Sequence, residues 1–192
     1  LQNNLKKHDN LKIIKNDTNI GIGASFKKAL DLATYEKIMI APGDNDANLD
    51  LLQDIFKNIE KSDMITSYYL NREMRGRFRN IVSNLFHILY VLSFDIYLMY
   101  MNGPTVYPTN LIRTFKIHSN RFSIVSELTT KSLRSNISFI EVAGKMNTGT
   151  NNSSALNLKN LIEVVSVYIK IFIEIYFKSK KKFSERAKRK YI

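Results

Sequence analysis

The sequence contains no cysteine among its 192 residues. Disulfide bonds and zinc sites built from thiolates are therefore excluded, and cysteine usage gives no indication of the redox compartment. Apolar runs typical of a simple membrane span are also missing, because the two most apolar stretches, residues 85–101 and 158–177, are both interrupted by polar side chains. Residues 1–15 are polar and basic and contain no signal-peptide core.

Acidic residues are scarce, with 17 Asp and Glu against 29 Lys and Arg, which gives a net charge of +12. The excess is concentrated in residues 178–190, which contain eight Lys or Arg and a single acid, Glu185. A run of this kind is most often a solvated tail, and otherwise it meets nucleic acid or an anionic membrane surface. The length allows one domain with a real core, and a hydrophobic content of 44% supports a folded protein.

An acidic turn follows a short apolar run at residues 38–41. A Pro-Gly pair breaks the run, Asp44 and Asp46 come next, and Asn48 follows two residues later. This pattern predicts a buried strand, and acidic groups just past the carboxyl end of such a strand lie where open α/β sheets hold ligands. Two carboxylates on a tight turn suit Mg²⁺ or Mn²⁺ together with ligand phosphates. The alternative is a solvated turn that caps the next helix.

Strands and helices are predicted to alternate along the first part of the chain. The predicted strands are residues 11–14, 37–41 and 64–69, and the predicted helices are residues 21–33 and 49–59. This β-α-β-α-β order predicts a parallel α/β sheet with crossover helices. Further along we expect a short extended piece, a helix and a strand, at residues 105–107, 126–134 and 137–142.

Two further groups of residues are candidates for binding a ligand. Gly21 and Gly23 follow the first predicted strand, where small residues let a backbone approach a ligand closely, although a third glycine that would complete a dinucleotide fingerprint is absent. Much further along the chain, a helix that begins after residue 76 would place Arg79 and Ser83 on one face, with Arg75 one turn earlier. Guanidinium groups beside a hydroxyl suit a phosphate, because guanidinium offers forked donors. The alternative is a basic surface helix.

Residues 158–177 carry polar side chains at every third or fourth position, which form one narrow polar stripe on a helix. The rest of the helix surface is apolar, so we expect the helix to lie in a membrane interface or to dock on another helix. The lysines that follow could attract acidic lipids. An ordinary core helix of a soluble domain is the alternative.

The order of these segments resembles family 2 glycosyltransferases of the GT-A fold, especially the branch that transfers sugars to polyprenyl phosphates, similar to dolichol-phosphate mannose synthase. The likeness covers residues 11–177. The matching segments are residues 19–24, the Asp44-x-Asp46-x-Asn48 turn, residues 71–83, Asn102-Gly103, Glu127, Glu141-Val142 and residues 153–156.

The resemblance implies an α/β, GT-A-like and mostly parallel sheet flanked by helices, with a C-terminal amphipathic membrane-associated helix. It implies an enzyme that moves a sugar from a nucleotide-sugar to an acceptor with inversion. Asp44 and Asp46 would be the catalytic metal ligands for Mg²⁺ or Mn²⁺, which stabilises charge on the leaving diphosphate, and Asn48 would be a further ligand. Gly21 and Gly23, with the two aspartates, would line the donor site.

For the acceptor, the resemblance implies a polyprenyl phosphate whose phosphate is bound by Arg75, Arg79 and Ser83. Such an acceptor is already anionic and needs little help from a general base. The implied location is the cytoplasmic face of a membrane, where the protein would be peripheral or embedded in the interface and would contact an anionic lipid surface.

The expected organisation has three parts: a glycosyltransferase-like domain at residues 1–157 that lacks the family's first strand, an amphipathic interface helix at residues 158–178, and a basic tail at residues 179–192. Because the family's first strand holds the nucleotide base, the chain is expected to be an N-terminally truncated piece. Two positions depart from the family: Lys145 is the only cation in a loop that usually holds an arginine, and Met99 replaces an aspartate.

A second function remains open on the sequence, and it is a non-catalytic basic module that binds a membrane surface or nucleic acid. The basic run near the end favours it. It leaves the strand-turn-Asp pattern unexplained, so nucleic acid is not the favoured partner. A degenerate relative without activity is a third alternative.

Overall fold

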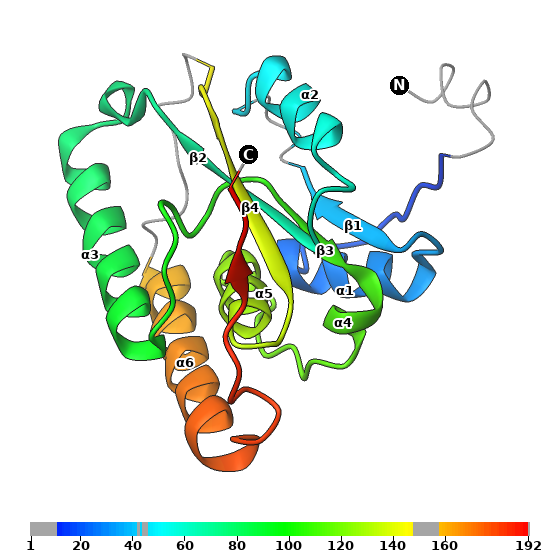
Figure 1. Ribbon diagram of the computed structural model, residues 1–192, viewed down its shortest axis with the longest axis vertical. Helices are drawn as coiled ribbons and strands as arrows, with labels where there is room; N and C mark the ends of the chain where they lie inside the picture. The colour runs from blue at the N-terminus through cyan, green and yellow to red at the C-terminus, as the bar shows by residue number, and fades with distance from the viewer. Residues whose placement is uncertain (1–10, 42, 44–45, 148–157, 192) are drawn as a thin grey trace.

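The computed structural model describes residues 11–41, 43, 46–147 and 158–191 (Figure 1). In this part of the chain, one mixed sheet is covered by helices on both faces. The sheet order is β1-β3-β2-β4-β5. The strands are β1 (Lys37–Ile40), β2 (Met64–Tyr69), β3 (Thr105–Pro108), β4 (Ser138–Gly144) and β5 (Lys188–Arg189).

Strand β3 is antiparallel to both of its neighbours, β1 and β2, whereas β2 pairs in parallel with β4, and β4 with β5. Strands β1, β2 and β4 therefore point the same way. Their carboxyl ends meet at one edge of the sheet, which is the edge where α/β sheets hold ligands.

One expectation about the sheet is wrong, because residues 11–14 form no strand and lie outside the ladder. The expected mostly parallel sheet holds for β1, β2, β4 and β5, which point the same way, but residues 105–108 insert between β1 and β2 in the antiparallel direction and make the sheet mixed. The sequence of β3 indicates only a four-residue strand after a turn. The direction of this strand depends on the end of the sheet at which the preceding helix finishes.

The helices are α1 (Ile22–Leu32), α2 (Leu49–Lys57), α3 (Arg77–Phe94), α4 (Thr109–Arg113), α5 (Ile124–Leu133) and α6 (Leu158–Ile173). Helices α1, α2, α5 and α6 lie within a few residues of their predicted positions, whereas the short α4 was not predicted. Helix α6 continues into a π turn, Glu174–Lys178, and a 3₁₀ turn, Arg72–Met74, precedes α3. Asn48 caps α2, since its side-chain oxygen accepts a hydrogen bond from Asp50 N at 3.0 Å.

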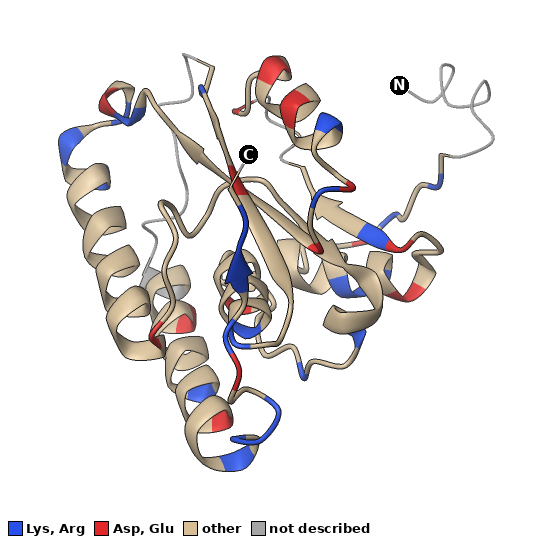
Figure 2. Cartoon of the chain, in the orientation of Figure 1, with Lys and Arg blue, Asp and Glu red and all other residues tan. Residues whose placement is uncertain are grey.

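Helices α3 and α6 lie side by side (Figure 1), and α3 has no Asp, Glu, Lys or Arg after its first turn (Figure 2). Their contact is aromatic: the ring of Tyr168 on α6 meets Tyr90 and Phe94 of α3 edge-on at 5.4 and 5.5 Å. Tyr168 also donates a hydrogen bond to Ser93 at 2.6 Å. Among the alternatives left open for this helix, these contacts support docking on another helix. None of the described helices has the length and apolar character needed to cross a membrane.

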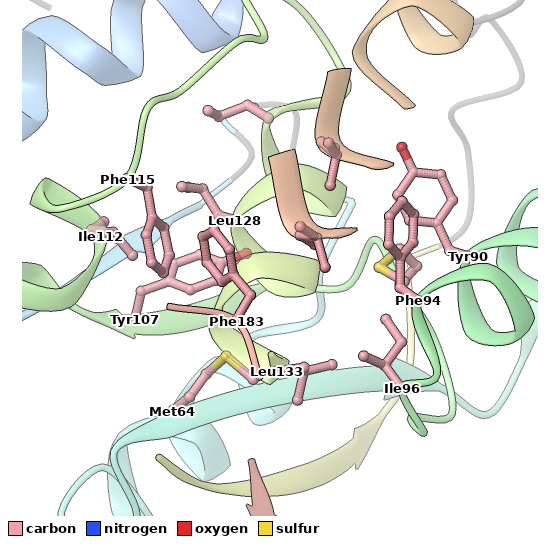
Figure 3. Packing of buried hydrophobic residues seen from close by; sticks show 14 of the residues in the cluster. Met64, Tyr90, Phe94, Ile96, Tyr107, Ile112, Phe115, Leu128, Leu133 and Phe183 are labelled. Carbon is pink, nitrogen blue, oxygen red and sulfur yellow. The ribbon is translucent and has the colours of Figure 1, made fainter. Parts of the chain in front are cut away.

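Alternating residues of the strands divide the core into two clusters. Met64, Tyr107 and Phe139 face the larger cluster, which α1, α3, α4, α5 and α6 cover (Figure 3). Their neighbours Ile65 and Val106 face the smaller cluster, which α2 covers. One sheet thus carries one helix on one face and five on the other.

Residues 179–191, expected as the described part of a basic tail, fold back onto the domain. Phe183 is fully buried in the larger core. Lys188 N and Lys190 N donate hydrogen bonds to Ile137 O and Phe139 O, both at 2.8 Å, so the segment ends as edge strand β5. A buried phenylalanine, pairing at the sheet edge and the ion pairs of Arg186 with Asp95 and Arg189 with Glu141 hold this charged segment in place.

Candidate functional site

Asp46 lies in the loop after β1, at the carboxyl edge of the sheet. Its carbonyl oxygen accepts a hydrogen bond from Asn147 N at 2.9 Å, and Asn48 N donates to Lys145 O at 3.1 Å. The loops that follow β1 and β4 are therefore joined through their backbones. This pairing fixes the position of the Asp46 backbone, and so of its carboxylate, relative to the edge of the sheet.

The loop after β2 joins the same edge through Asn71. Its amide nitrogen donates to Met146 O at 2.9 Å, and its amide oxygen accepts from Met146 N at 2.8 Å. An asparagine side chain that bonds both groups of one residue replaces a backbone ladder pair. Three loops, from three strands that point the same way, thus converge at one place.

Arg75 binds Asp46 directly. Its Nη2 atom is 2.9 Å from Asp46 Oδ2, and both side chains are largely buried, at 10% and 19% exposed. Nη1 donates to the hydroxyl of Tyr100 at 2.8 Å, and the guanidinium lies 5.3 Å from the ring centroid of Tyr69. Burial opposes the charge of Arg75, but Tyr100 and then Asp46 outweigh it and raise its pKa.

Arg72 forms the second cation of the site. Its guanidinium lies 4.6 Å from the ring centroid of Tyr100, and Nη2 donates to Asn84 Oδ1 at 2.8 Å and, more weakly, to Ser83 Oγ at 3.4 Å. The amide of Asn80 holds the turn by donating to Arg72 O at 2.7 Å. Two arginines are thereby fixed against one tyrosine.

Four buried polar atoms in this cluster make no hydrogen bond within the described part of the chain. They are Arg72 Nε, Arg75 Nε, Asn80 Oδ1 and His87 Nδ1. A buried polar group without a partner costs free energy, so such a group in a native fold calls for a ligand or water. Burial and then the charge of Arg72 lower the pKa of His87, which keeps its ring neutral at pH 7. The two free N–H donors favour an anion.

The structure brings together part of the predicted site. Asp46, Arg75 and, through Arg72, Ser83 lie in one cluster. Arg79 is half-buried in the first turn of α3. Asp44 lies outside the described residues, as do residues 153–156 of the family resemblance.

Gly21 and Gly23 contact a different part of the molecule. A Cβ at Gly21 would lie 2.4 Å from Asn120 O, and one at Gly23 would lie 2.7 Å from Asn120 C. Gly21 also has φ of +89°, which side-chain-bearing residues rarely adopt. Both glycines therefore let α1 start against the backbone of residues 119–121.

Sequence reasoning missed four members of the cluster: Arg72, Tyr69, Tyr100 and His87. The aromatic residues belong to apolar stretches, where a tyrosine is indistinguishable from a core residue. Arg72 lies within a run of four arginines, and the run alone does not say which of them turns inward. Only the 3₁₀ turn before α3 aims Arg72 and Arg75 back at the sheet edge.

The donor set around Asp46 fits a metal that is bound mainly by ligand phosphates. Among the described residues, which exclude Asp44, no group of three His, Asp or Glu side chains could hold a metal by itself. Mg²⁺ and Mn²⁺ at phosphate sites need only one or two protein carboxylates, and Asp46 offers one. The Asn48 oxygen already caps α2, but a carbonyl oxygen has a second lone pair.

No family model and no curated protein match this sequence. Among solved structures, the chain is similar to glucosyl-3-phosphoglycerate synthase from Mycobacterium tuberculosis. The complex with UDP aligns with a TM-score of 0.57 and 12% identity, over 79% of this chain and 55% of that one. A complex of the same enzyme with Mn²⁺, UDP-glucose and phosphoglyceric acid gives a TM-score of 0.52 and 10% identity, over 84% and 56% of the two chains.

The fold is similar to that of GT-A glycosyltransferases. At this identity the likeness concerns the fold alone, and the chain spans little more than half the length of the enzyme it matches. The expected GT-A-like architecture is confirmed to that extent. Residue roles depend on the geometry of the Asp46–Arg75 cluster.

Proposed function

We propose that this chain acts in a glycosyltransferase that moves a sugar from a nucleotide-sugar to a phosphate-bearing acceptor, with inversion at the anomeric carbon. The observation that carries this proposal is the Asp46–Arg75 pair at the carboxyl edge of a GT-A-like sheet. It combines a carboxylate for a metal with a buried cation for a phosphate. The similar enzyme was solved with Mn²⁺, UDP-glucose and phosphoglyceric acid, which is a ligand set of that chemistry.

On the donor side, Asp46 and Asp44 are the proposed ligands of Mg²⁺ or Mn²⁺, with Asn48 as a third. The metal supplies stabilisation of negative charge on the leaving diphosphate. In the absence of donor, Arg75 neutralises Asp46. Gly21 and Gly23 have no part in this proposal, because they pack the start of α1 against residues 119–121 instead.

On the acceptor side, the free Nε donors of Arg72 and Arg75 are the proposed partners of a phosphate, together with Ser83, which contacts Arg72, and Arg79 in the first turn of α3. Two forked cations held against Tyr100 form a fixed clamp, because stacking restricts their rotation. We propose a polyprenyl phosphate as the acceptor. Its phosphate oxygen attacks the anomeric carbon while the bond to the nucleotide diphosphate breaks.

The acceptor implies a location at the cytoplasmic face of a membrane, with the protein attached peripherally. Residues 158–178 are the proposed interface segment, and five apolar side chains of α6 are exposed: Leu161, Ile162, Val165, Ile169 and Ile173. Exposed apolar side chains on one helix beside lysines suit an anionic lipid surface.

The test is transfer by the full chain from labelled nucleotide-sugars to polyprenyl phosphate, with Mn²⁺ present. Asp46→Asn is expected to lower the rate by about 10²-fold or more, since it removes charge from the metal site. Mn²⁺ binding measured by electron paramagnetic resonance should weaken in parallel. The matched control is Asp54→Asn, which changes an exposed carboxylate on α2.

Equal transfer rates and equal Mn²⁺ binding in the wild type and Asp46→Asn would contradict the metal assignment. The second function, a basic module that binds nucleic acid, makes a different prediction. Salt-sensitive binding to RNA that survives Asp46→Asn, with no binding to liposomes, would favour that module.

A further inference from the structure

Helix α3 exposes a row of large apolar side chains along its full length. Phe78, Ile81, Leu85, Ile88 and Leu92 follow one another at intervals of three and four residues, and Leu89 lies beside them. Phe78, Leu85 and Leu92 are 69%, 63% and 76% exposed. Only Tyr90 and Phe94, of its 18 residues, are buried. Monomeric soluble proteins rarely expose a continuous apolar row of this length.

Helix α6 extends the same surface. Val165, Ile169 and Ile173 are exposed and lie, at 100° per residue, next to the aromatic residues of α6 that pack on α3. Helices α3 and α6 lie side by side (Figure 1). We call these two rows together the α3–α6 face.

Two acidic residues of the polar stripe, Glu163 and Glu174, bond within the protein, whereas Lys170 of the same stripe is exposed. Glu163 accepts hydrogen bonds from Ser119 Oγ at 2.6 Å and Ser123 Oγ at 2.8 Å. Glu174 lies 2.9 Å from the buried ammonium of Lys131. The acidic residues of this segment are thereby bonded inside the fold, while Val165, Ile169 and Ile173 are left exposed.

The exposed charged residues of α3 and α6 are cations: Lys170 is exposed on α6 beside Ile169, and the others stand near the ends of the two helices. Helix α3 has no acidic residue, and its only cations are Arg77 and Arg79 in the first turn. Lys178, Lys180 and Lys181 are exposed at the far end of α6. Figure 2 shows blue residues near the start of α3 and tan along the rest of that helix, whereas α6 carries both red and blue residues along its length.

We infer that the α3–α6 face docks flat on an anionic lipid bilayer, with α3 as the main contact. The inference rests on the proposed function, from which it takes the membrane as the partner. It adds α3 to the interface segment, residues 158–178, that the proposed function names. Amphipathic helices in an interface bury their apolar face between headgroups and acyl chains while flanking cations bind anionic lipids. The α3–α6 face has both features.

A second copy of this chain is the less suitable occupant. A twofold interface would bring the cations of two faces together, and each copy carries a net charge of +12. A bilayer that contains anionic lipid neutralises the same cations instead. Docking also places the start of α3, where Arg72 and Arg75 are held, close to the headgroups and so to a lipid-linked phosphate.

The absence of tryptophan provides a clean test. Single substitutions Leu85→Trp on α3, Val165→Trp on α6 and Phe56→Trp on α2 each introduce one fluorophore at an exposed apolar position. On addition of phosphatidylcholine vesicles that contain phosphatidylglycerol, we expect blue-shifted emission for the first two proteins and none for Phe56→Trp. Vesicles without phosphatidylglycerol should give a weaker shift.

Flotation with the same vesicles measures affinity. Leu85→Glu combined with Leu92→Glu should lower vesicle binding by about tenfold or more, whereas Phe56→Glu should leave it unchanged. Circular dichroism checks that each variant is folded. Transfer to a short, water-soluble phosphate acceptor should persist in the α3 double variant, so failure of docking and failure of the proposed reaction are distinguishable.

Two outcomes would overturn the inference. One is equal flotation of the wild type and the folded α3 double variant. The other is a dimer in analytical ultracentrifugation that the double variant converts to a monomer, because that would identify the occupant as a second copy.

Discussion

Helix α5 is rich in polar residues and buried, whereas helix α3 is rich in apolar residues and largely outside the core. Nine of the ten residues of α5 are buried, and Glu127, Thr129 and Lys131 are among them. Helix α3 is richer in Leu, Ile and Phe, yet only two of its 18 residues are buried. Burial is therefore decided by position in the fold, and a polar helix can be central if its groups are bonded.

Hydrogen bonds within the protein offset the free-energy cost of burying the polar side chains of α5. Glu127 accepts from His118 N at 2.9 Å and Ser119 N at 2.7 Å, and its other partner is Lys131 at 2.8 Å. The ammonium of Lys131 also reaches Glu174 at 2.9 Å. Helix α3 has no such compensation on its exposed side, which is why it calls for a partner outside the chain.

The largest expected effect comes from removing one member of the buried network. Glu127→Ala should lower the free energy of unfolding by about 3–5 kcal/mol, because it leaves Lys131 buried with one partner fewer and two backbone N–H groups unpaired. Urea denaturation measures the change. The control, Glu60→Ala, removes an exposed carboxylate, and a similar loss there would show that net charge rather than the network matters.

A smaller effect is expected where α5 meets the sheet. Tyr107→Phe removes the hydroxyl that bonds Thr129 Oγ1 at 2.8 Å and should cost about 1 kcal/mol of unfolding free energy. The ring stays in place, so the cavity term is absent. Thermal unfolding of Tyr107→Phe beside Tyr97→Phe, which changes an exposed tyrosine, isolates the buried hydrogen bond.

Helix α3 has one polar group that should report pH. Burial, and then Arg72, lowers the pKa of His87 below its ordinary value of 6.5. The unfolded chain then binds a proton more readily, so stability should fall as pH drops through the range below about 6.5. His87→Gln should flatten this part of the stability profile, and identical profiles for both proteins would contradict the assignment.

The smallest effect is expected on the exposed side of α3. Leu92→Ser should change the free energy of unfolding by no more than about 0.5 kcal/mol, because Leu92 is 76% exposed. Leu128→Ser, at a fully buried position of α5, is the contrasting variant. A large loss from Leu92→Ser without lipid would mean that the chain itself covers this side.

Much of the secondary structure could be predicted from local patterns. Strand β2 has its predicted bounds, and α1 and α2 begin within a residue of theirs. Residues 11–14 look equally strand-like but find no neighbour in the sheet. The β-propensity of a segment indicates that its backbone can be extended, but the segment becomes a strand only if an unpaired sheet edge lies beside it.

Some residues of the candidate site could be predicted from the sequence, but their arrangement in space could not. Asp46 and Arg75 were expected to serve different ligands, yet they form one buried pair. Their contact requires the 3₁₀ turn before α3, which no motif in the sequence indicates. Tyr100 is drawn in from an apolar stretch, and only its contacts with both arginines distinguish it from a core residue.

The sequence by itself determined the alternation of elements, the acidic turn after an apolar strand and the polar stripe on the last long helix, since these depend on local spacing. The tertiary structure alone decided which way that stripe faces. A helical period defines two faces but not which of them meets the core, because that depends on the partners that neighbouring elements present. Here Ser119, Ser123 and Lys131 attract the acids of α6 inward, and the apolar face is left for α3 and the surface beyond it.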